Sequence, residues 1–323
     1  KPKGQADVEF TLKQNLQDHD KKLDYHLEVR PKGMTVTYEG FPYEFSGIRG
    51  LVTAKPGVVT LQEIQCDRSY KINGEIRDNG RMLKLKIDAA GVPFDKKLMA
   101  AMPGDFTTVL KTVTPGGTLD IKLDDLTIIQ VEQGSSTTKP AKTKGKSVAT
   151  AATRPSEKGG LAGPGWQARG VIGLHDTTID VAFGAKKLNG KLNGQIRQDS
   201  RGTAIDLKAD LKKILIGNYE ITDVKGRLTK KAGGPLVRIE NLEARAYGGR
   251  LAGREVMIRM SDPVKYAFSL FYQNVSLSEL VNAGLADPTA RGGVLGQLEG
   301  KISLEATAGD PKSRRAAGTV VIT

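Results

Sequence analysis

Cysteine and histidine are scarce in this sequence of 323 residues, which has one cysteine and three histidines. The single cysteine, Cys66, excludes a disulfide within the chain, and we expect a small buried or half-buried side chain without a redox partner. One cysteine and three histidines leave too few ligands for a transition-metal site. We therefore expect no metal and no cofactor.

Aromatic residues make up 5% of the chain and hydrophobic residues 38%, whereas glycine occurs 38 times. This composition is lean for one thick core and rich in turns, so it disfavours a single large enzyme fold. No stretch approaches the ~18 apolar residues of a membrane span, and the start lacks a signal-peptide pattern. Because the chain begins with Lys1 and not with methionine, we expect it to be part of a longer protein.

Basic residues exceed acidic ones by 49 to 36, a net charge of +13. Nucleic acid is one class of partner for such a chain. However, lysine and arginine are scattered among acids, as in Lys84, Lys86 and Asp88, and form no stripe with aromatic platforms. We expect solvated strand faces and no nucleic-acid partner.

Hydrophobic residues recur with a period of two over most of the chain, which is typical of strands with one wet and one dry face. Strands are predicted at residues 8–12, 25–29, 179–183, 205–211, 256–260 and 302–306. Gly, Asn, Asp or Pro separates most of them, so we expect short antiparallel meanders. The clearest alternating positions are Leu83, Leu85, Ile87, Leu119, Ile121, Leu123, Tyr266, Phe268, Leu270 and Tyr272.

Two segments are predicted to be helical, near residues 94–111 and 276–286. The first starts near Asp95 and is interrupted by Pro103 and Gly104. The second opens with a capping box, in which Ser276 accepts from a backbone N–H and Glu279 reaches back. A double glycine and a new strand follow each helix.

The residues from 132 to 165 are rich in Lys, Thr, Ser, Gly and Pro and cannot bury enough apolar surface to become ordered. We predict a first β module at 1–131, a flexible basic linker at 132–165 and a second β module at 166–323. Gly145, Lys146 and Ser147 resemble the end of a phosphate-binding loop, but the required earlier glycine is Pro140, so the match is accidental.

An internal repeat links the two modules. Residues 43–55 align with 219–231 at an offset of 176, and the order strand, helix, double glycine, strand recurs after each. A weaker echo at an offset of 120 relates residues 71–77 to 191–197. The expected fold class is mainly β: repeated, twisted antiparallel modules that form a taco-like groove, with two short helices and a disordered linker.

Two short helices cannot cover the apolar face of so many strands. An apolar row left wet costs about 25 cal/mol per Å², so an open sheet implies an apolar ligand such as an acyl chain. The predicted lining residues are Leu83, Leu85, Ile87, Leu119, Ile121, Leu123, Tyr266, Phe268, Leu270, Tyr272, Ile302 and Leu304.

The segments at 242–253, 274–280, 293–304 and 317–322 resemble the AsmA-like C-terminal region of bacterial envelope proteins, which is related to TamB. The resemblance is best over 219–323. It implies a repeating β-groove protein in the periplasm, anchored in the inner membrane by a segment absent from this chain. It also implies transfer of phospholipid toward outer-membrane components, without catalytic residues.

The leading hypothesis is therefore a non-enzymatic envelope protein that binds or conducts phospholipid or another acyl-chain lipid and contributes to outer-membrane assembly. The alternative is an assembly scaffold of closed β sandwiches without a lipid channel. Catalysis is disfavoured, because the nearest acid/base pairs are Asp124 with Asp125, on opposite strand faces, and His26 with Glu28, on an exposed one. Nucleotide binding is disfavoured too, since the glycines at 292–300 run directly into a strand.

Overall fold

The computed structural model describes residues 2–14, 23–38, 41–67, 69–101, 115–130, 165–179, 185–285 and 293–323. The strands before the expected linker are β1 (Pro2–Lys3), β2 (Ala6–Gln14), β3 (Leu23–Pro31), β4 (Met34–Tyr38), β5 (Phe41–Lys55), β6 (Val58–Cys66), β7 (Tyr70–Arg77), β8 (Met82–Pro93) and β9 (Gly116–Ile129). Those after it are β10 (Gly165–Ile179), β11 (Ala185–Asp199), β12 (Gly202–Ile216), β13 (Tyr219–Lys230), β14 (Leu236–Ala246), β15 (Gly249–Arg259), β16 (Lys265–Ser276), β17 (Gln297–Thr307) and β18 (Asp310–Ile322). The helices are α1 (Lys96–Ala101), α3 (Leu277–Gly284) and the 3₁₀ turn η1 (Asp78–Gly80).

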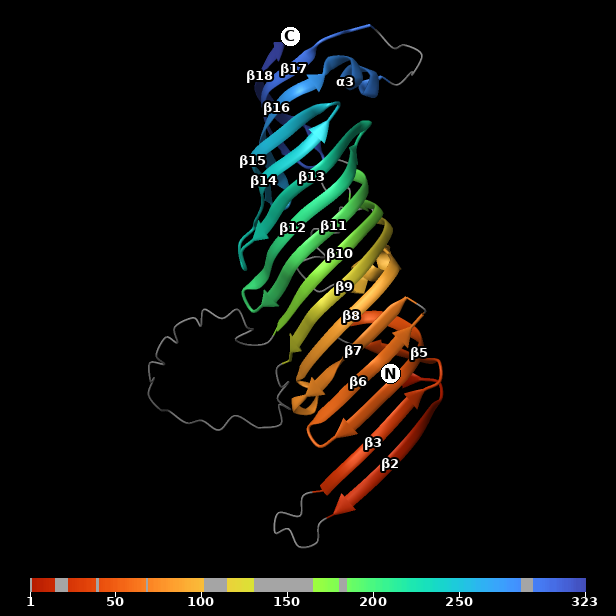
Figure 1. Cartoon of the computed structure of the whole chain (residues 1–323). Helices are drawn as coiled ribbons and strands as arrows, with labels where there is room; N and C mark the ends of the chain where they lie inside the picture. Colours follow the sequence, from red (N-terminus) through yellow and green to blue (C-terminus); the bar gives the residue numbers. More distant parts are fainter. Residues whose placement is uncertain are drawn as a thin grey trace, which may run out of the picture.

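All of these strands belong to one open antiparallel sheet, which runs from β2 at one end of the molecule to β18 at the other (Figure 1). From β5 onward each strand pairs with the next one in sequence, and β3 joins β2 to β5. β4 pairs with the first half of β5, and β1 pairs with β4. The predicted mainly β, groove-like fold is confirmed.

The sheet continues directly across the predicted boundary between the two modules. β9 pairs with β10 over nearly its whole length, so that Leu119 faces Leu174 and Ile121 faces Ile172. The linker predicted at 132–165 lies outside the described residues, except for Gly165 at the start of β10. The two β modules therefore share one continuous hydrogen-bonded sheet.

Strand alternation gives the sheet two unlike faces. The inner face carries Leu119, Ile121 and Leu174, and the outer face carries Asp120 and Lys122. The largest buried cluster lies on the inner face of β8 to β14, where α1 packs against it. Its buried members are Ala89, Val92, Phe94, Leu98, Leu119, Leu174, Leu188, Leu211, Val224 and Ala244.

A series of β-bulges interrupts the register of successive strands. Seven strand residues have a left-handed backbone with φ of 47° to 63°, and each precedes an inner-face residue. A bulge adds one residue to a strand and locally increases its bend and twist. The seven are Glu63, Gly91, Asp176, Lys187, Asp223, Asn241 and Asn274.

Three of these bulges are stabilised by the same kind of hydrogen bond, from a backbone N–H to a side-chain oxygen. The backbone N–H of Glu63 donates to Asn73 Oδ1 at 2.7 Å, that of Gly91 to Asp120 Oδ1 at 2.8 Å, and that of Asp176 to Asn189 Oδ1 at 3.0 Å. In each case the acceptor projects from the neighbouring strand. An amide that the bulge removes from the ladder thereby keeps a partner, and the curvature is specified by the sequence.

The internal repeat is confirmed in space. Unit 1 consists of β5 to β9 with α1 after β8, and unit 2 consists of β13 to β17 with α3 after β16. Gly47 and Asp223, which are 176 residues apart, both have positive φ. The repeat therefore includes the bulges as well as the order of the elements.

Helices are present at both predicted places. α1 covers Lys96–Ala101, and residues 102–114 lie outside the described part of the chain. In α3 the Ser276 hydroxyl accepts from the Glu279 N–H at 3.3 Å, as predicted. The predicted return contact from Glu279 is wrong, because the Ser276 N–H donates to the Tyr247 carbonyl at 2.9 Å.

Most predicted strands are present as well. The one expected at 179–183 is observed only at its first residue, where β10 ends at Ile179, and residues 180–184 are outside the described ranges. Within the described residues, no helix has the length and apolar character needed to cross a membrane.

Candidate functional site

The inner face carries an unbroken apolar row along the sheet. In the strand registers, one residue of each strand from β6 to β18 faces the next, and all are aliphatic, phenylalanine or glycine. Twelve steps of about 4.8 Å give a length of about 58 Å. The row is Ile64, Ile72, Ile87, Leu123, Gly170, Gly194, Leu207, Leu228, Ile239, Val256, Phe268, Leu304 and Ala316.

Two facing glycines, Gly170 and Gly194, lie in the middle of this row. A Cβ atom at Gly170 would lie 2.0 Å from the Lys122 carbonyl oxygen, and one at Gly194 would lie 2.1 Å from the Asp206 oxygen. Neighbouring backbone thus occupies the space that a side chain needs. The close approach of the strands here requires glycine at both positions.

All of the predicted lining residues occupy the inner face. Ile87 faces Leu123 between β8 and β9, and Phe268 faces Leu304 between β16 and β17. Leu119 and Tyr266 are buried and Ile302 is 37% exposed. The remaining nine are half-buried: Leu83, Leu85, Ile87, Ile121, Leu123, Phe268, Leu270, Tyr272 and Leu304.

Helix α1 covers part of the inner face in unit 1. Phe94, Leu98 and Ala101 are 7%, 6% and 3% exposed, and the first two pack into the buried cluster of β8 to β14. Tyr43 and Tyr70 contact the same cluster. This end of the groove is filled by the chain itself.

Unit 2 is covered less. Helix α3 has no buried residue, and the last buried member of the cluster is Ala244 on β14, with Leu251 on β15 partly buried against it. Past that strand the inner face carries Phe268, Leu270 and Tyr272 on β16, all half-buried. Acyl chains prefer such aliphatic and aromatic surfaces with few polar groups. Val256, Tyr266, Val275, Leu298 and Ala306 on β15 to β17 are buried, so the open surface here lies around Phe268, Leu270, Tyr272 and Ile302.

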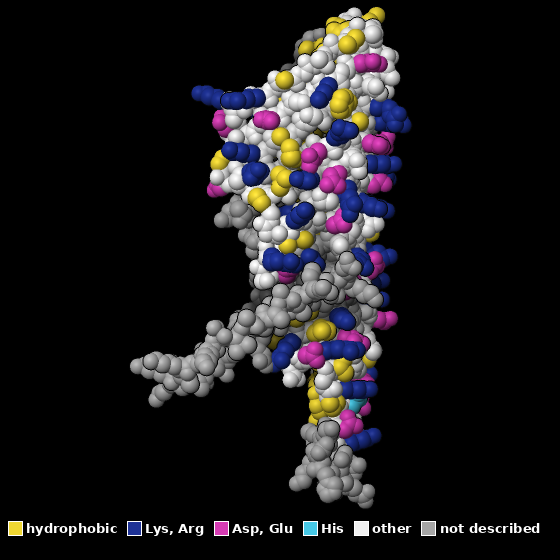
Figure 2. All heavy atoms as spheres, turned by 90° about the vertical axis from the view of Figure 1, so that its left-hand side faces the viewer, with side chains coloured by type: hydrophobic (Ala, Val, Ile, Leu, Met, Phe, Trp, Pro, Cys, Tyr) yellow, Lys and Arg dark blue, Asp and Glu magenta, His cyan; other side chains and the backbone are white. Residues whose placement is uncertain are grey.

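The outer face has the opposite chemistry. Figure 2 shows basic and acidic side chains alternating along the right-hand side of the molecule, the face turned to the viewer in Figure 1. Asp206 accepts from Arg227 through both carboxylate oxygens, at 2.8 and 2.9 Å, and Arg238 pairs with Glu255 at 3.1 Å. These partly exposed pairs suit a solvated face, where each contributes little to stability.

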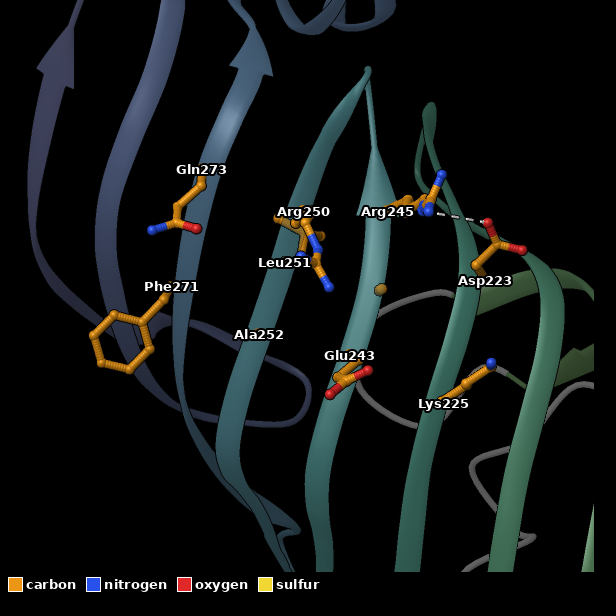
Figure 3. A pocket seen from close by; sticks show the side chains of 10 residues that line it. Asp223, Lys225, Glu243, Arg245, Arg250, Leu251, Ala252, Phe271 and Gln273 are labelled. Atoms are coloured by element: carbon orange, nitrogen blue, oxygen red, sulfur yellow. Dashed lines mark ion pairs between the residues drawn. The ribbon is translucent and has the colours of Figure 1, made fainter.

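A hollow of about 450 Å³ lies on this outer face across β13 to β16. Figure 3 shows its charged lining, in which Arg245 turns toward Asp223 with 3.7 Å between Nε and Oδ2. Phe271 at its border is 44% exposed, and Lys301 Nζ lies 5.4 Å from the ring centroid. With Lys225, Glu243 and Arg250 also lining it, the hollow is too polar for an acyl chain.

The titratable groups form no catalytic constellation within the described residues. His26 Nε2 lies 3.0 Å from Glu28 Oε1, and His175 Nε2 lies 2.7 Å from Asp120 Oδ2, both on open strand surface. The hydrogen bond from His26 lowers the pKa of Glu28. No group of three His, Cys, Asp or Glu side chains is placed to hold a metal ion in this part of the chain.

Cys66 is buried next to the aromatic residues of unit 1, and burial raises the pKa of its thiol to about 11. Burial, with Tyr43 as hydrogen-bond partner, also raises the pKa of Tyr70. Phe45 packs edge-on against Tyr70 with centroids 5.6 Å apart. These residues belong to the packed end of the groove.

One polar cluster interrupts the inner face, and sequence analysis missed it. Trp166, Gln198 and Thr203 face each other across β10, β11 and β12. Lys230 on β13 lies nearby, and its Nζ donates to the Thr203 carbonyl at 2.8 Å. The four residues are spread over 65 positions, and only the strand register brings them together.

Comparisons of the chain with family models, curated proteins and solved structures find no match. The site is therefore interpreted from its own residues.

Proposed function

We propose that this chain binds diacyl lipid along its inner face and conducts phospholipid across the bacterial envelope, without catalysing a reaction. The observation that carries the proposal is the continuous apolar row from Ile64 to Ala316 on an open sheet. A row of about 58 Å is longer than the hydrocarbon core of a bilayer, which is about 30 Å thick. Several lipids can therefore lie along it one after another.

The contrast between the apolar inner face and the charged outer face favours a lipid ligand over a protein ligand. A protein partner needs hydrogen-bonding groups of matching geometry, whereas an acyl chain needs only apolar contact. The inner face offers mainly aliphatic and aromatic side chains and glycine, with Lys230 as an exception, whereas charged side chains alternate along the outer face. Lipid tails on the inner face would remove from water the surface that α1 and α3 leave open.

The envelope setting rests on the resemblance of residues 219–323 to AsmA-like proteins. On that basis we place the chain in the periplasm, with phospholipid as cargo and inner- and outer-membrane components as partners. Its bulged strands repeat in unit 1 and unit 2, as expected for a groove built by adding modules.

The test is organic extraction and mass spectrometry of lipid from the purified protein. Phe268→Asp and Leu270→Lys place a charge on the most open inner surface, so each variant should lose most bound lipid, since burying an unpaired charge against acyl chains is costly. Phe271→Asp is the matched control, because Phe271 follows Leu270 directly on β16 and lies on the outer face. It should keep its lipid.

All variants are first checked for the β-sheet circular dichroism of the parent. Folded parent protein that carries no lipid and takes none from vesicles would sink the proposal. Equal loss in Phe271→Asp would show that the inner face has no special role.

A scaffold function is the second candidate, and a specific observation favours it. In β8 to β14 the residues beside the bulges, such as Leu119, Leu174 and Leu211, are 4% to 6% exposed and already buried by the chain. If that packing extends through unit 2 in solution, no lipid enters. Hydrogen exchange of β15 to β18 with and without lipid decides, because only a lipid-filled groove gains protection.

A further inference from the structure

A second inner-face row shows where the apolar surface ends. Beside the first row, facing residues run from Val8 on β2 to Ala306 on β17, and Lys230 is the one charged residue among them. It faces Ile205 on one side and Val237 on the other. A cation in such a position needs a polar partner.

The described residues satisfy Lys230 only in part. An ammonium group has three donors, and one is used by the Thr203 carbonyl at 2.8 Å. No carboxylate of the described chain forms an ion pair with it. Lys230 is half-buried, so its remaining donors and its charge favour an added anion.

A basic hollow opens at the same place. It has a volume of about 440 Å³, and its lining includes Arg197, Arg201, Lys230 and Lys231 with one acid, Asp206. That acid is already bound by Arg227 at 2.8 Å. Asp199 pairs with Arg201 at 2.7 Å and lies 3.9 Å from Arg197, so Lys230 and Lys231 are the basic lining residues that form no ion pair within the described residues.

This hollow lies at the strand ends, where Gln167, Gln195 and Asp206 of the outer face line it together with Lys230. Lys230 ends β13, and Lys231 follows it with its side chain exposed. Trp166 is the second residue of β10, and its Nε1 donates to Gln198 Oε1 at 3.0 Å. An indole with one apolar side and one polar group suits the boundary between lipid tails and water.

We propose that Lys230, with Lys231 and Gln198, binds the phosphate of a phospholipid headgroup at these strand ends, while its tails lie on the inner face of β14 to β16. The proposal rests on the proposed lipid-binding function and adds the headgroup class, a phosphodiester. Val237, Ile258 and Tyr266 continue the row of Lys230 toward unit 2. At ~4.8 Å per strand, Tyr266 lies about 14 Å from Lys230, within reach of one acyl chain.

The experiment compares two lipids with the same tails, dioleoylphosphatidylglycerol and dioleoylglycerol, offered in equal amounts in mixed micelles. Retained lipid is measured by extraction and mass spectrometry. The parent should retain the phospholipid about tenfold more than the diacylglycerol, the ratio expected for ~1.4 kcal/mol. Lys230→Met keeps the aliphatic stem without the charge, so this preference should fall to about twofold or less while diacylglycerol retention stays unchanged.

Lys225→Met is the matched control, because Lys225 is an exposed lysine on the outer face of the same strand. It should keep the parental preference. If Lys230→Met does not fold, Lys231→Met with Gln198→Leu removes two proposed donors without touching the bond to Thr203, and should also lower the preference.

Each other result has its own meaning. A Lys230→Met protein that keeps the full preference overturns the headgroup site but leaves lipid binding intact. A parent that retains neither lipid overturns the proposed function itself. Inorganic phosphate that raises the melting temperature of the parent, but not of Lys230→Met, as much as the phospholipid does, marks a site for free phosphate and overturns the headgroup assignment.

Discussion

Unit 1 and unit 2 share strand order, bulges and helix position, yet their helices pack against the sheet to different depths. Helix α1 inserts Leu98 and Ala101 into the inner face, where they are 6% and 3% exposed, whereas α3 has no buried residue. A helix therefore fills part of the inner face in unit 1, whereas the helix of unit 2 leaves its inner face more open. The comparison indicates that the strands form the sheet in both units, whereas the helix after the fourth strand packs deeply into it only in unit 1.

Truncating one leucine in each helix should give the largest difference in stability between the two units. Leu98→Ala removes a fully buried side chain and is expected to lower the free energy of unfolding by about 3 kcal/mol. Leu280→Ala in α3 removes a half-buried one and should cost about 1 kcal/mol. Urea denaturation followed by circular dichroism measures both, and equal costs would mean that α3 is as deeply packed as α1.

Two glycines at matching repeat positions give the next largest contrast. Gly50 has φ +130°, and a Cβ there would lie 2.7 Å from the Glu63 carbonyl oxygen. Gly226 is less restricted, since its added Cβ would meet the movable Ile239 side chain at 3.2 Å. Gly50→Ala should therefore cost about 2 kcal/mol and Gly226→Ala about 0.5, with thermal melts as the readout. The reverse order would contradict the strand geometry described for unit 1.

The helix caps should differ less. Asp95 Oδ1 accepts from the N–H groups of both Lys97 and Leu98 at 2.9 Å, whereas the Ser276 hydroxyl accepts from one backbone N–H, that of Glu279, and shares a hydrogen bond with the Ser278 hydroxyl at 3.1 Å. Asp95→Ala should lower global stability by about 1 kcal/mol, because α1 belongs to the core. Ser276→Ala should mainly speed amide exchange within α3, with a global change of about 0.5 kcal/mol or less. A large global loss in Ser276→Ala would show that α3 holds the sheet together.

The smallest expected effect is on the melting temperature at acidic pH. The Gly91 N–H and then His175 lower the pKa of Asp120 below its ordinary value of 3.8. A carboxyl whose pKa is lowered by folding stabilises the fold above its unfolded pKa, and this contribution is lost as pH falls through the folded pKa. Asp120→Asn keeps an acceptor for Gly91 but cannot titrate, so its melting temperature should fall less than that of the parent between pH 5 and pH 2. Parallel curves would mean that the charge does not support this bulge.

The sequence alone predicted the parts that depend on local patterns. Alternation placed Leu83, Leu85 and Ile87 on one face, and the repeat at residues 43 and 219 foretold the two units. The Ser276 cap followed from its spacing to Glu279. Each of these features is encoded within a few neighbouring residues or within a direct repeat.

What was missed depends on pairing between distant strands. No local pattern indicates that Lys230 reaches Thr203, or that Gly170 faces Gly194, because register is set by the sum of all bulges between them. The left-handed residues Lys187 and Asp223 carry no glycine signal that would reveal a bulge. The different roles of α1 and α3 were also hidden, since burial depends on what lies beneath a helix.

Photo-crosslinking at two neighbouring positions tests the central claim most directly. A photoreactive phenylalanine is placed at Leu270, on the inner face of β16, or at Phe271, on its outer face, and the protein is irradiated with phospholipid vesicles. Mass spectrometry should find lipid adducts at position 270 and few or none at 271. Equal labelling at both positions, or none at either in folded protein, would contradict a lipid groove on the inner face.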